Sequence, residues 1–540
     1  MFCSDIIAPD ILDWQDNSTI FIDAPTGSGK TTFILKTLLP TALELGREIL
    51  YLSNRQLLHK QLIKQACELF TIPYQDMKDE KIAEFPGITF MTYQTLQECL
   101  HANLIFNPNP FYFYLVADEI HYLPEDSDFN PQIGRLLKWF PVMEKNIFIA
   151  ISATIDSTLQ YLGFYNGGWQ EMVEEENRTI YWRKPQKIMN RLNGRAEYLY
   201  FYHIATEKPQ YNIVVYKTVE DIVEEINSDN SDDKWIVFQS NKERANKNLV
   251  RKVTKSCMFL SADNKGEEEM KEIVENGCFS ADILVTTKVL DNGISLNDGL
   301  IKKIVLDTIS ETEFLQMIGR RRRCEGDNTP LTLYIPKKSV KYFVYLLNEQ
   351  IVPELESVQT IPETLLEKMM QSEEIYRTCR KYFDIRENKL VLNPIAKDNL
   401  QRRKRFCERI LTALKKDEYA FVKEQLSWIG QEVEESSIID LAEEKKKKVR
   451  KHMQEYLVSH EGKPLGKQEQ KKFREEVRSS FRILLPELFV SDSRMPGLKK
   501  INEAFSCLDL EWEIHTVPGK KKGDETVWIL QQKEPKLPAI

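Results

Sequence analysis

Short apolar runs alternate with helical patterns through the first 306 residues, and this alternation constrains the fold more than any other feature of the chain. Five runs lie before residue 160 and five lie after residue 210: 19–24, 48–52, 88–91, 111–117, 146–151, 212–216, 235–239, 258–261, 283–286 and 303–306. Runs this apolar, separated by helices, are typical of parallel strands that are covered on both faces. Because the alternation pauses between about 160 and 205, the pattern predicts two α/β domains in tandem.

The rest of the chain has a different character. Beyond about residue 345 the strand pattern stops and long charged helical patterns follow, for example at 401–425 and 438–458. Helical patterns at 480–484 and 497–505 then precede two β-rich segments, 512–517 and 526–530, which flank a turn at 518–523 and predict a hairpin. We therefore expect an α/β protein in which two parallel-sheet domains are followed by a mainly helical region and a small α+β end. We place the domains at 1–165, 206–345, 346–475 and 476–540, with a connecting segment at 166–205.

Composition limits the class of protein. The chain has 540 residues, of which 42% are hydrophobic, and it has no apolar run of the roughly 18–20 residues that would span a bilayer. The first residues lack the pattern of a signal peptide, and the nine cysteines form no CxxC pair. We therefore expect a folded cytoplasmic protein with free thiols and no zinc site. Lys and Arg minus Asp and Glu give 74 − 82 = −8, which would ordinarily count against a nucleic-acid-binding protein.

A glycine-rich segment, APTGSGKT at residues 24–31, directly follows the first apolar run and opens a helical pattern. Its glycines allow successive backbone N–H groups to curl around phosphates, Lys30 would reach the β- and γ-phosphates, and the Thr31 hydroxyl would ligate Mg²⁺. A coincidental glycine-rich turn is the alternative. The predicted nucleotide-binding residues are Ala24, Pro25, Thr26, Gly27, Ser28, Gly29, Lys30, Thr31 and Thr32.

Two adjacent acids, Asp118 and Glu119, follow the fourth apolar run. At the carboxyl edge of a buried strand they have no packing role and their burial costs desolvation, so a metal or a substrate would have to justify them. Asp118 is placed to hold Mg²⁺, and Glu119 is placed to orient and activate the water that attacks the γ-phosphate. An ordinary acidic loop is the alternative. Ser152 and Thr154 follow the fifth run in the same way, although small hydroxyl residues are also common in turns.

Four consecutive arginines close the segment QMIGRRRR at residues 316–323. Arg320 and Arg323 are one helical turn apart, so both side chains could reach a common phosphate. Arginine suits a planar, bidentate contact with a developing phosphoryl charge. A solvated or phosphate-binding helix face is the alternative that charge alone favours.

The order of these segments resembles the motif order of the superfamily 2 helicases, of the broad DEAD/DEAH-box class, over residues 15–335. Each motif lies at the expected strand edge: motif I at 24–32, Ia at 53–61 (SNRQLLHKQ), Ib at 91–96 (MTYQTL), II at 118–121 (DEIH), III at 152–154 (SAT), IV at 237–241 (VFQSN), V at 286–295 (TTKVLDNGIS) and VI at 316–323. Two departures stand out. The acid that often follows Gly-Ile in motif V is Ser295 here, and nothing upstream of Ala24 resembles the adenine-reading motif of true DEAD-box proteins.

The resemblance implies two RecA-like lobes with ATP and Mg²⁺ in the cleft between them. Gln316, Arg320 and Arg323 would approach the γ-phosphate from the second lobe as sensor and arginine fingers, and Gly293 would lie against the nucleotide. Ser152 and Thr154 would couple hydrolysis to lobe movement. Contacts with the backbone of a single nucleic-acid strand, which are indifferent to base sequence, would come from Arg55, Thr92, Ser240 and Thr287.

The C-terminal region is the basic part of the chain. Residues 401–540 contain 29 Lys and Arg and 24 Asp and Glu, a balance of +5, which leaves −13 for the first 400 residues. The clusters at 402–405 and 445–448 could follow phosphates or could be solvated helix faces. The terminal hairpin, with lysines at 520–522 in its tip, resembles the wing of a winged-helix module that would approach a duplex. A hairpin that only caps the helices is the alternative.

Together these features favour an ATP hydrolase stimulated by nucleic acid: a helicase or translocase that moves along or unwinds DNA, with RNA as the second choice. The alternative is an ATP-gated switch or scaffold in a replication or antiviral complex, which would bind nucleic acid and unwind little. Such a protein would bind a protein partner through its helical C-terminal region. A strand-displacement assay separates the two hypotheses.

Overall fold

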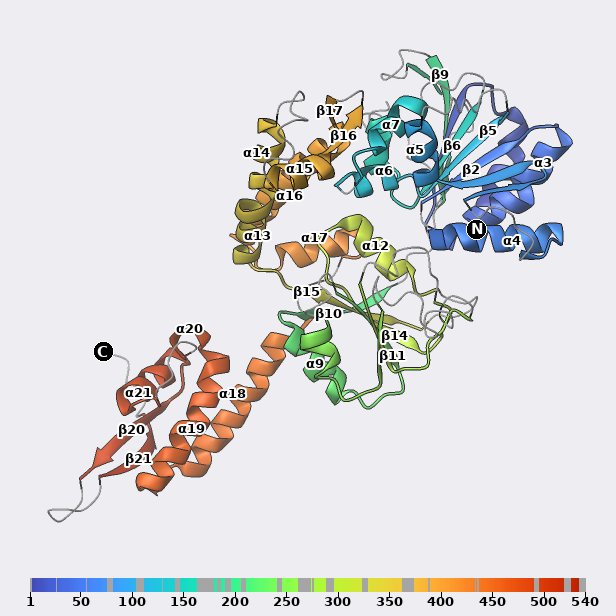
Figure 1. Ribbon diagram of the computed structural model, residues 1–540. Coiled ribbons are helices and arrows are strands. Elements are labelled where there is room, and N and C mark those ends of the chain that lie inside the picture. The colour runs from blue at the N-terminus through green and yellow to red at the C-terminus, as the bar shows by residue number, and fades with distance from the viewer. Residues whose placement is uncertain are drawn as a thin grey trace. The chain divides into compact units, whose positions relative to one another are not determined.

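The computed structural model describes residues 2–25, 27–54, 56–74, 81–102, 111–128, 130–140, 146–162, 179–181, 186–189, 196–204, 210–239, 245–260, 273, 276–287, 296–322, 329–361, 373–386, 389–432, 434, 437–489, 495–518 and 526–533 (Figure 1). The chain divides into two compact units, one of residues 1–213 and 222–435 and one of 214–221 and 436–540. Within the described residues, every helix is too short or too polar to span a lipid bilayer.

The first sheet has nine strands in the order β3-β4-β2-β5-β6-β1-β9-β7, and β8 pairs with β9. The six strands from β4 to β9 in this order are parallel, whereas β3, β7 and β8 are antiparallel to their neighbours. Because parallel strands end at the same edge, the segments that follow β1, β5 and β6 meet there. The strands are β1 (Ser18–Asp23), β2 (Ile49–Ser53), β3 (Ile82–Phe85), β4 (Ile88–Thr92), β5 (Tyr114–Asp118), β6 (Ile147–Ser152), β7 (Thr179–Tyr181), β8 (Gln186–Met189) and β9 (Ala196–Ile204).

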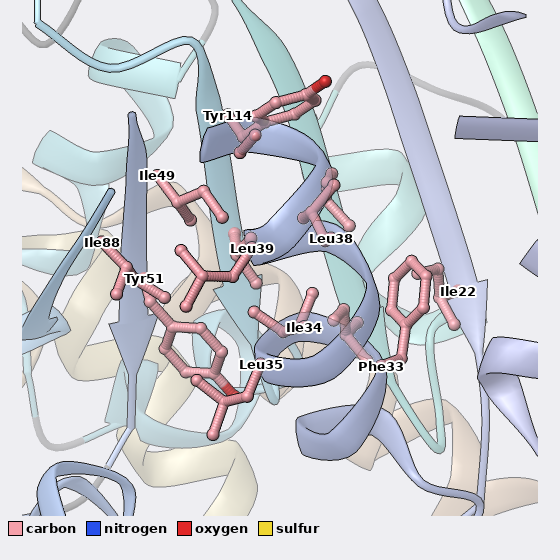
Figure 2. Close-up of a cluster of buried hydrophobic side chains, with 14 of the residues drawn as sticks. Ile22, Phe33, Ile34, Leu35, Leu38, Leu39, Ile49, Tyr51, Ile88 and Tyr114 are labelled. Carbon is pink, nitrogen blue, oxygen red and sulfur yellow. The ribbon is translucent and has the colours of Figure 1, made fainter. Parts of the chain in front are cut away.

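Alternate side chains of this sheet enter two separate cores, as expected for a sheet covered on both faces. Ile49 and Tyr51 of β2 enter one core, and Leu50 and Leu52 enter the other. The first core is covered by α1 (Cys3–Ile7), η1 (Ala8–Asp13), α2 (Lys30–Phe33), η2 (Ile34–Leu38), α3 (Leu39–Glu44) and α4 (Gln56–Phe70). The second is covered by α5 (Tyr93–His101), α6 (Tyr122–Glu125), α7 (Ile133–Trp139) and α8 (Asp156–Leu159). Figure 2 shows the first core, with Phe33, Leu35 and Leu39 lying over the strand residues.

The second sheet is built in the same way. Its order is β12-β13-β11-β14-β15-β10, and the pairs from β12 to β15 are parallel. The strands are β10 (Tyr211–Tyr216), β11 (Lys234–Phe238), β12 (Cys257–Leu260), β13 (Ile283–Thr286), β14 (Ile301–Val305) and β15 (Leu331–Pro336), and the helical segments are α9 (Val219–Ser228), η8 (Ala245–Val250) and α12 (Glu311–Gly319). Its strands are buried along most of their length, which explains their continuous apolar runs.

A helical region follows the second sheet. It consists of α13 (Val340–Leu346), η11 (Leu347–Ile351), α14 (Val352–Thr360), α15 (Glu373–Tyr382), the hairpin of β16 (Phe383–Arg386) and β17 (Lys389–Leu392), α16 (Pro394–Leu414) and α17 (Ala420–Trp428). The N-terminal end of α16 places Ile395 in the second core of the first sheet. Its C-terminal end packs with α13 and α17, and Trp428 of α17 lies 5.3 Å from Phe314 of α12, centroid to centroid. The region therefore contacts both sheet domains.

The C-terminal unit has a core of its own, with Phe473, Phe481 and Phe505 among its buried residues. Its elements are β18 (Ile439–Asp440), which pairs with β10, α18 (Leu441–His460), β19 (Pro464–Leu465), α19 (Lys467–Leu484), α20 (Pro486–Phe489), α21 (Leu498–Cys507), β20 (Trp512–Val517) and β21 (Val527–Gln532). The last three strands form an antiparallel sheet in the order β19-β21-β20. The lysine-rich tip at 520–522 lies outside the described residues.

The expected fold class is confirmed: two parallel-sheet domains precede a mainly helical region and a small α+β end. Two expectations about strands are wrong. The pause between 160 and 205 contains β7, β8 and β9, and the strands do not stop at 345, because β16 and β17 form a hairpin. β9 escapes the pattern because its buried positions include Tyr200 and Tyr202, whose hydroxyls donate to the Asp13 carbonyl and the Asp10 carboxylate, both at 3.0 Å.

Candidate active site

The glycine-rich loop connects the end of β1 to the helical segment that begins at Lys30. Gly27 and Gly29 have φ angles of 86° and 83°, a left-handed conformation that is strained for any residue with a Cβ. The Ser28 hydroxyl donates to the Pro25 carbonyl at 2.7 Å and tightens the turn between them. The loop therefore has the curled backbone that a phosphate group requires. Thr26 lies outside the described residues, and Thr31 and Thr32 occupy the first turn of the helix.

The two adjacent acids lie at the same edge of the sheet. β5 ends at Asp118, and Glu119 has a φ of 50°, so the chain turns sharply after the strand. This turn brings Oε1 of Glu119 within 3.0 Å of Nζ of Lys30. A non-glycine residue in this region costs about 1–2 kcal/mol, and strain of this kind is typical of functional sites.

Two buried tyrosines donate hydrogen bonds to Asp118. The Tyr51 hydroxyl of β2 donates to Oδ2 of Asp118 at 2.6 Å, and the Tyr93 hydroxyl donates to its backbone carbonyl at 2.9 Å. The Glu119 N–H donates to Oδ1 at 3.0 Å. Both oxygens of this buried carboxylate therefore have a donor, which fixes their direction.

The acids differ in their electrostatics. Burial, with the adjacent charge of Glu119, raises the pKa of Asp118. Burial also opposes ionisation of Glu119, but the charges of Lys30, His121 and Arg320 outweigh it and lower the pKa of Glu119. For Lys30, burial favours the neutral form, yet the charges of Glu119 and Asp118 prevail and the pKa is raised. Asp118 and the Thr31 hydroxyl supply the hard oxygen ligands that suit Mg²⁺.

His121 links the first domain to the second. Its Nδ1 lies 2.9 Å from Oγ of Ser152 and 3.3 Å from Oε2 of Glu119, and its Nε2 lies 2.6 Å from Nε2 of Gln316 on α12. In this geometry Nδ1–H donates to the oxygens of Ser152 and Glu119. Ser152 is in turn bonded to Thr154, whose backbone N–H donates to Oγ at 2.9 Å. One imidazole therefore contacts motifs II, III and VI.

Motif VI reaches the site through Arg320, the residue that ends α12. Arg320 is buried, and its charge acts on Glu119. Its backbone carbonyl accepts from the N–H of Leu296 at 2.7 Å, and Arg322 donates its N–H to the carbonyl of Leu296 at 2.8 Å. These bonds fasten the motif to the strand edge of the second domain. Arg323 and Gly293, which belong to the same predicted set, lie outside the described residues.

The predicted nucleic-acid contacts are only partly described. Thr92 is buried and its hydroxyl accepts the N–H of Thr95 at 3.0 Å, which caps α5. Thr287 follows β13, and its N–H donates to the Leu260 carbonyl at 3.3 Å. No contact of either residue with the acids or with Lys30 is found among the described residues. Arg55 and Ser240 lie outside those residues, so a role in strand binding stays a prediction for all four.

Sequence reasoning did not find Tyr51, Tyr93 or the role of His121. Tyr51 lies within the apolar strand β2 and Tyr93 directly follows β4, where an aromatic residue indicates only a core position. Strand register was the one available signal, because Tyr51 lies two residues before the end of β2 and β2 neighbours β5. His121 was part of the DEIH segment, but its contacts with Ser152 and Gln316 depend on tertiary structure.

Tyr51→Phe should raise the Mg²⁺ concentration needed for half-maximal ATP turnover several-fold. The change removes one donor from the Asp118 carboxylate, and a hydrogen bond to a charged group contributes about 1.5–3 kcal/mol. If Asp118 holds Mg²⁺ as predicted, its carboxylate would then point less firmly toward the metal. A magnesium titration of the ATPase reaction measures the effect. Tyr112→Phe is the matched control, because its hydroxyl donates to Thr89 at 3.2 Å, away from the acids. An equal shift in both variants would contradict a positioning role.

One family model matches the first part of the chain. Residues 6–162 match the family model described as DEAD/DEAH box helicase. The matched stretch contains the glycine-rich loop, both acids, His121 and Ser152. No curated protein matches the chain in sequence.

Solved structures show distant similarity. S. cerevisiae Dbp5 bound to RNA and ADP BeF3 has 14% identity and a TM-score of 0.40, over 61% of this chain and 81% of that one. Mss116p bound to ssRNA and AMP-PNP has 15% identity and a TM-score of 0.42, over 76% and 89%. Mycobacterium smegmatis helicase Lhr bound to ssDNA and AMP-PNP has 14% identity and a TM-score of 0.38, over 73% and 59%. At this level of identity and TM-score, the solved structures carry no assignment of function.

Proposed function

Residues 6–162 match the family model of the DEAD/DEAH box helicases, and we propose that the protein is an ATP-dependent nucleic-acid helicase or translocase whose two parallel-sheet domains act as RecA-like lobes. The observation that carries the proposal is one chain of contacts. Lys30 pairs with Glu119, Glu119 with His121, and His121 with Gln316 of the other lobe. A nucleotide bound at the loop would therefore affect contacts made by both lobes.

Nucleotide binding would change the partner of Lys30. In the structure, Lys30 neutralises Glu119 at 3.0 Å. The β- and γ-phosphates of ATP, cradled by the backbone of the loop, would compete for the same ammonium group. Since Lys30 is a main cause of the lowered pKa of Glu119, its withdrawal would raise that pKa and make the carboxylate a better proton acceptor.

Hydrolysis would then use groups from both lobes. Glu119 would orient the attacking water and accept its proton at a carboxylate oxygen. Arg320, with Arg323 as the predicted second finger, would stabilise the charge that develops on the transferred phosphoryl group. Bound Mg²⁺ would supply charge neutralisation on the phosphates, with Asp118 and Thr31 as its protein ligands.

Movement would follow from the loss of the γ-phosphate. The His121 ring is bonded to Gln316 on one side and to Ser152 and Glu119 on the other, so a shift of Glu119 changes the bonds that hold the lobes. Opening and closing of this kind would move the lobes along the backbone of one strand. Thr92, Thr287, Arg55 and Ser240 are the proposed backbone contacts.

The test is ATP hydrolysis measured alone and with single-stranded DNA, duplex DNA and RNA, each at two salt concentrations. We expect stimulation by a single strand, and the strand with the larger effect identifies the substrate. A strand-displacement assay on the same preparation then reports unwinding. Stimulated hydrolysis without displacement would favour the switch or scaffold instead. Absence of any stimulation would contradict a nucleic-acid-dependent enzyme of either kind.

Lys30→Ala should reduce stimulated ATP turnover by at least about 10²-fold, because a charged group that faces the transferred phosphates is lost. Nucleotide affinity should fall as well. The same change leaves Asp118 and Glu119 without their lysine, so a thermal unfolding curve must accompany the assay. Lys36→Ala is the matched control, since Lys36 is exposed on the same helical segment. Turnover close to that of the control would contradict the role of the loop.

A further inference from the structure

Helix α19 of the C-terminal unit carries five cations on one side. Lys467, Lys471, Arg474, Arg478 and Arg482 follow one another at intervals of three or four residues, so at 3.6 residues per turn they fall within an arc of about 80° and cover about 22 Å of helix axis. Lys467, Lys471 and Arg482 are exposed, and Arg474 and Arg478 are half-buried. We call this set the basic stripe.

The acids of α19 lie mostly away from the basic stripe. Glu469 and Glu476 project from the opposite flank, where Oε1 of Glu476 lies 3.2 Å from Nε2 of His452 on α18. Only Glu475 borders the stripe by its position along the helix. The face between the two flanks enters the core of the unit. The stripe is therefore a continuous surface dominated by positive charge.

The lysine run on α18 is built differently. Lys446 pairs with Glu443 at 2.7 Å, and Lys447 pairs with Glu444 at 2.8 Å. Acids one turn away thus offset this run, as on an ordinary solvated helix surface. Of the two basic helices in the unit, α19 is the one whose cations are grouped on one flank and whose acids lie mostly on another.

Arg474 is fixed in the middle of the stripe. The central carbon of its guanidinium group lies 4.4 Å from the ring centroid of Trp528 on β21. A guanidinium group held by stacking is already oriented, so little freedom is lost when its edge donates to a phosphate.

The stripe offers charge without a surface for stacking bases. Trp528 is only 5% exposed. The exposed large apolar side chains in the described part of residues 436–540 include no aromatic ring: Ile439, Val458, Leu488, Met495 and Val517. Surfaces that bind single strands combine cations with exposed aromatic rings, whereas the outside of a duplex presents its phosphates. These features favour a duplex as the ligand.

We propose that the basic stripe of α19 binds the phosphate backbone of duplex nucleic acid. The proposal rests on the proposed function in taking nucleic acid as the partner, and it adds the class of ligand and the surface that holds it. The contact needs no bases and no nucleotide. Binding should therefore be independent of sequence and should weaken steeply with salt.

The test measures binding of a short fluorescent duplex to the full-length protein without nucleotide, as a function of salt. The stripe variant combines Lys467→Gln, Lys471→Gln and Arg482→Gln, three exposed positions. The control combines Lys447→Gln, Lys448→Gln and Lys451→Gln, three exposed positions on α18, and loses the same charge. The slope of log affinity against log salt should fall by about 2–3 in the stripe variant, because each phosphate contact contributes about 0.9. The control should keep the slope of the unmodified protein.

Three results would overturn the proposal: no duplex binding by the unmodified protein, equal slopes in all three proteins, or equal losses in the two variants. Equal slopes in the three proteins would indicate that the stripe binds a different ligand, an acidic protein. If the triple variant unfolds, Lys471→Gln alone should lower the slope by about 0.9. Stimulation of the ATPase by single strands is measured separately on the unmodified protein. Loss of that stimulation with retained duplex binding would contradict the proposed function and leave the stripe supported.

Discussion

Glu119→Gln should lower nucleic-acid-stimulated ATP turnover by about 10²- to 10⁴-fold, the range that a general base contributes. Glutamine keeps the size of the side chain and can still accept a hydrogen bond from Lys30, which lies 3.0 Å away in the unmodified protein. It cannot take a proton from water. Steady-state turnover with saturating single-stranded nucleic acid measures the loss.

Nucleotide binding should survive Glu119→Gln, because the loop and Lys30 are unchanged. Titration with a fluorescent ATP analogue tests this, and the result should differ from that of Lys30→Ala, in which affinity falls too. Glu125→Gln is a suitable control, since Glu125 also lies near His121, with 4.0 Å between Oε2 and Nε2. Substantial turnover in both Glu119→Gln and Lys30→Ala would contradict the assignment of the site.

Arg320→Lys should lower the same turnover by roughly 10³-fold. An arginine that contacts the transferred phosphoryl group raises kcat by about that factor or more. Lysine keeps the positive charge near Glu119, which the charge of Arg320 influences. It lacks the planar fork of donors that two phosphate oxygens require. The loss should appear in kcat with little change in KM, since the contact forms as charge develops.

The matched control for Arg320→Lys is Arg251→Lys, an exposed arginine of the same sheet domain. It should turn over ATP at the rate of the unmodified protein. A loss confined to KM would indicate that Arg320 binds the ground state only. No loss at all would contradict a role of Arg320 in stabilising the transferred phosphoryl group.

The sequence predicted those parts of the site that depend on local structure. The glycine-rich loop follows a strand and opens a helix, and Asp118 ends the next strand but one in the sheet, so both could be placed from apolar runs alone. Register then brings Lys30 and Glu119 together, because parallel strands share an edge. Tyr51 could not be found in this way, since a buried tyrosine in a strand looks the same whether or not its hydroxyl meets a carboxylate.

Long-range pairing explains the other misses. β9 joins β1 across more than 170 residues of sequence, and its tyrosine-rich composition was not distinctive without the partners at Asp10 and Asp13. The contact between His121 and Gln316 joins residues 195 positions apart. Motif order could suggest that the two domains face one nucleotide, but the residue that connects them is set by packing.

The net charge of the whole chain does not predict the charge of its C-terminal region. The whole chain carries −8, yet residues 401–540 carry 29 basic and 24 acidic residues. Within that region Lys446 and Lys447 of α18 have acidic partners, and five of the six cations of α19 are grouped on one flank. The positions of the charges on a helix, more than their sum, therefore determine whether the helix presents a basic surface.

Helix α16 connects the core of the first sheet domain to a second hydrophobic cluster. Its 21 residues make it about 31 Å long. One end is fastened at Ile395 in the core of the first sheet domain, and the other ends in a cluster with Phe343 and Phe421. If the domains rotate about the ends of this helix in the proposed reaction, a rotation of about 10° would displace the far end by about 5 Å. That displacement exceeds the roughly 3.4 Å rise between nucleotides of one strand.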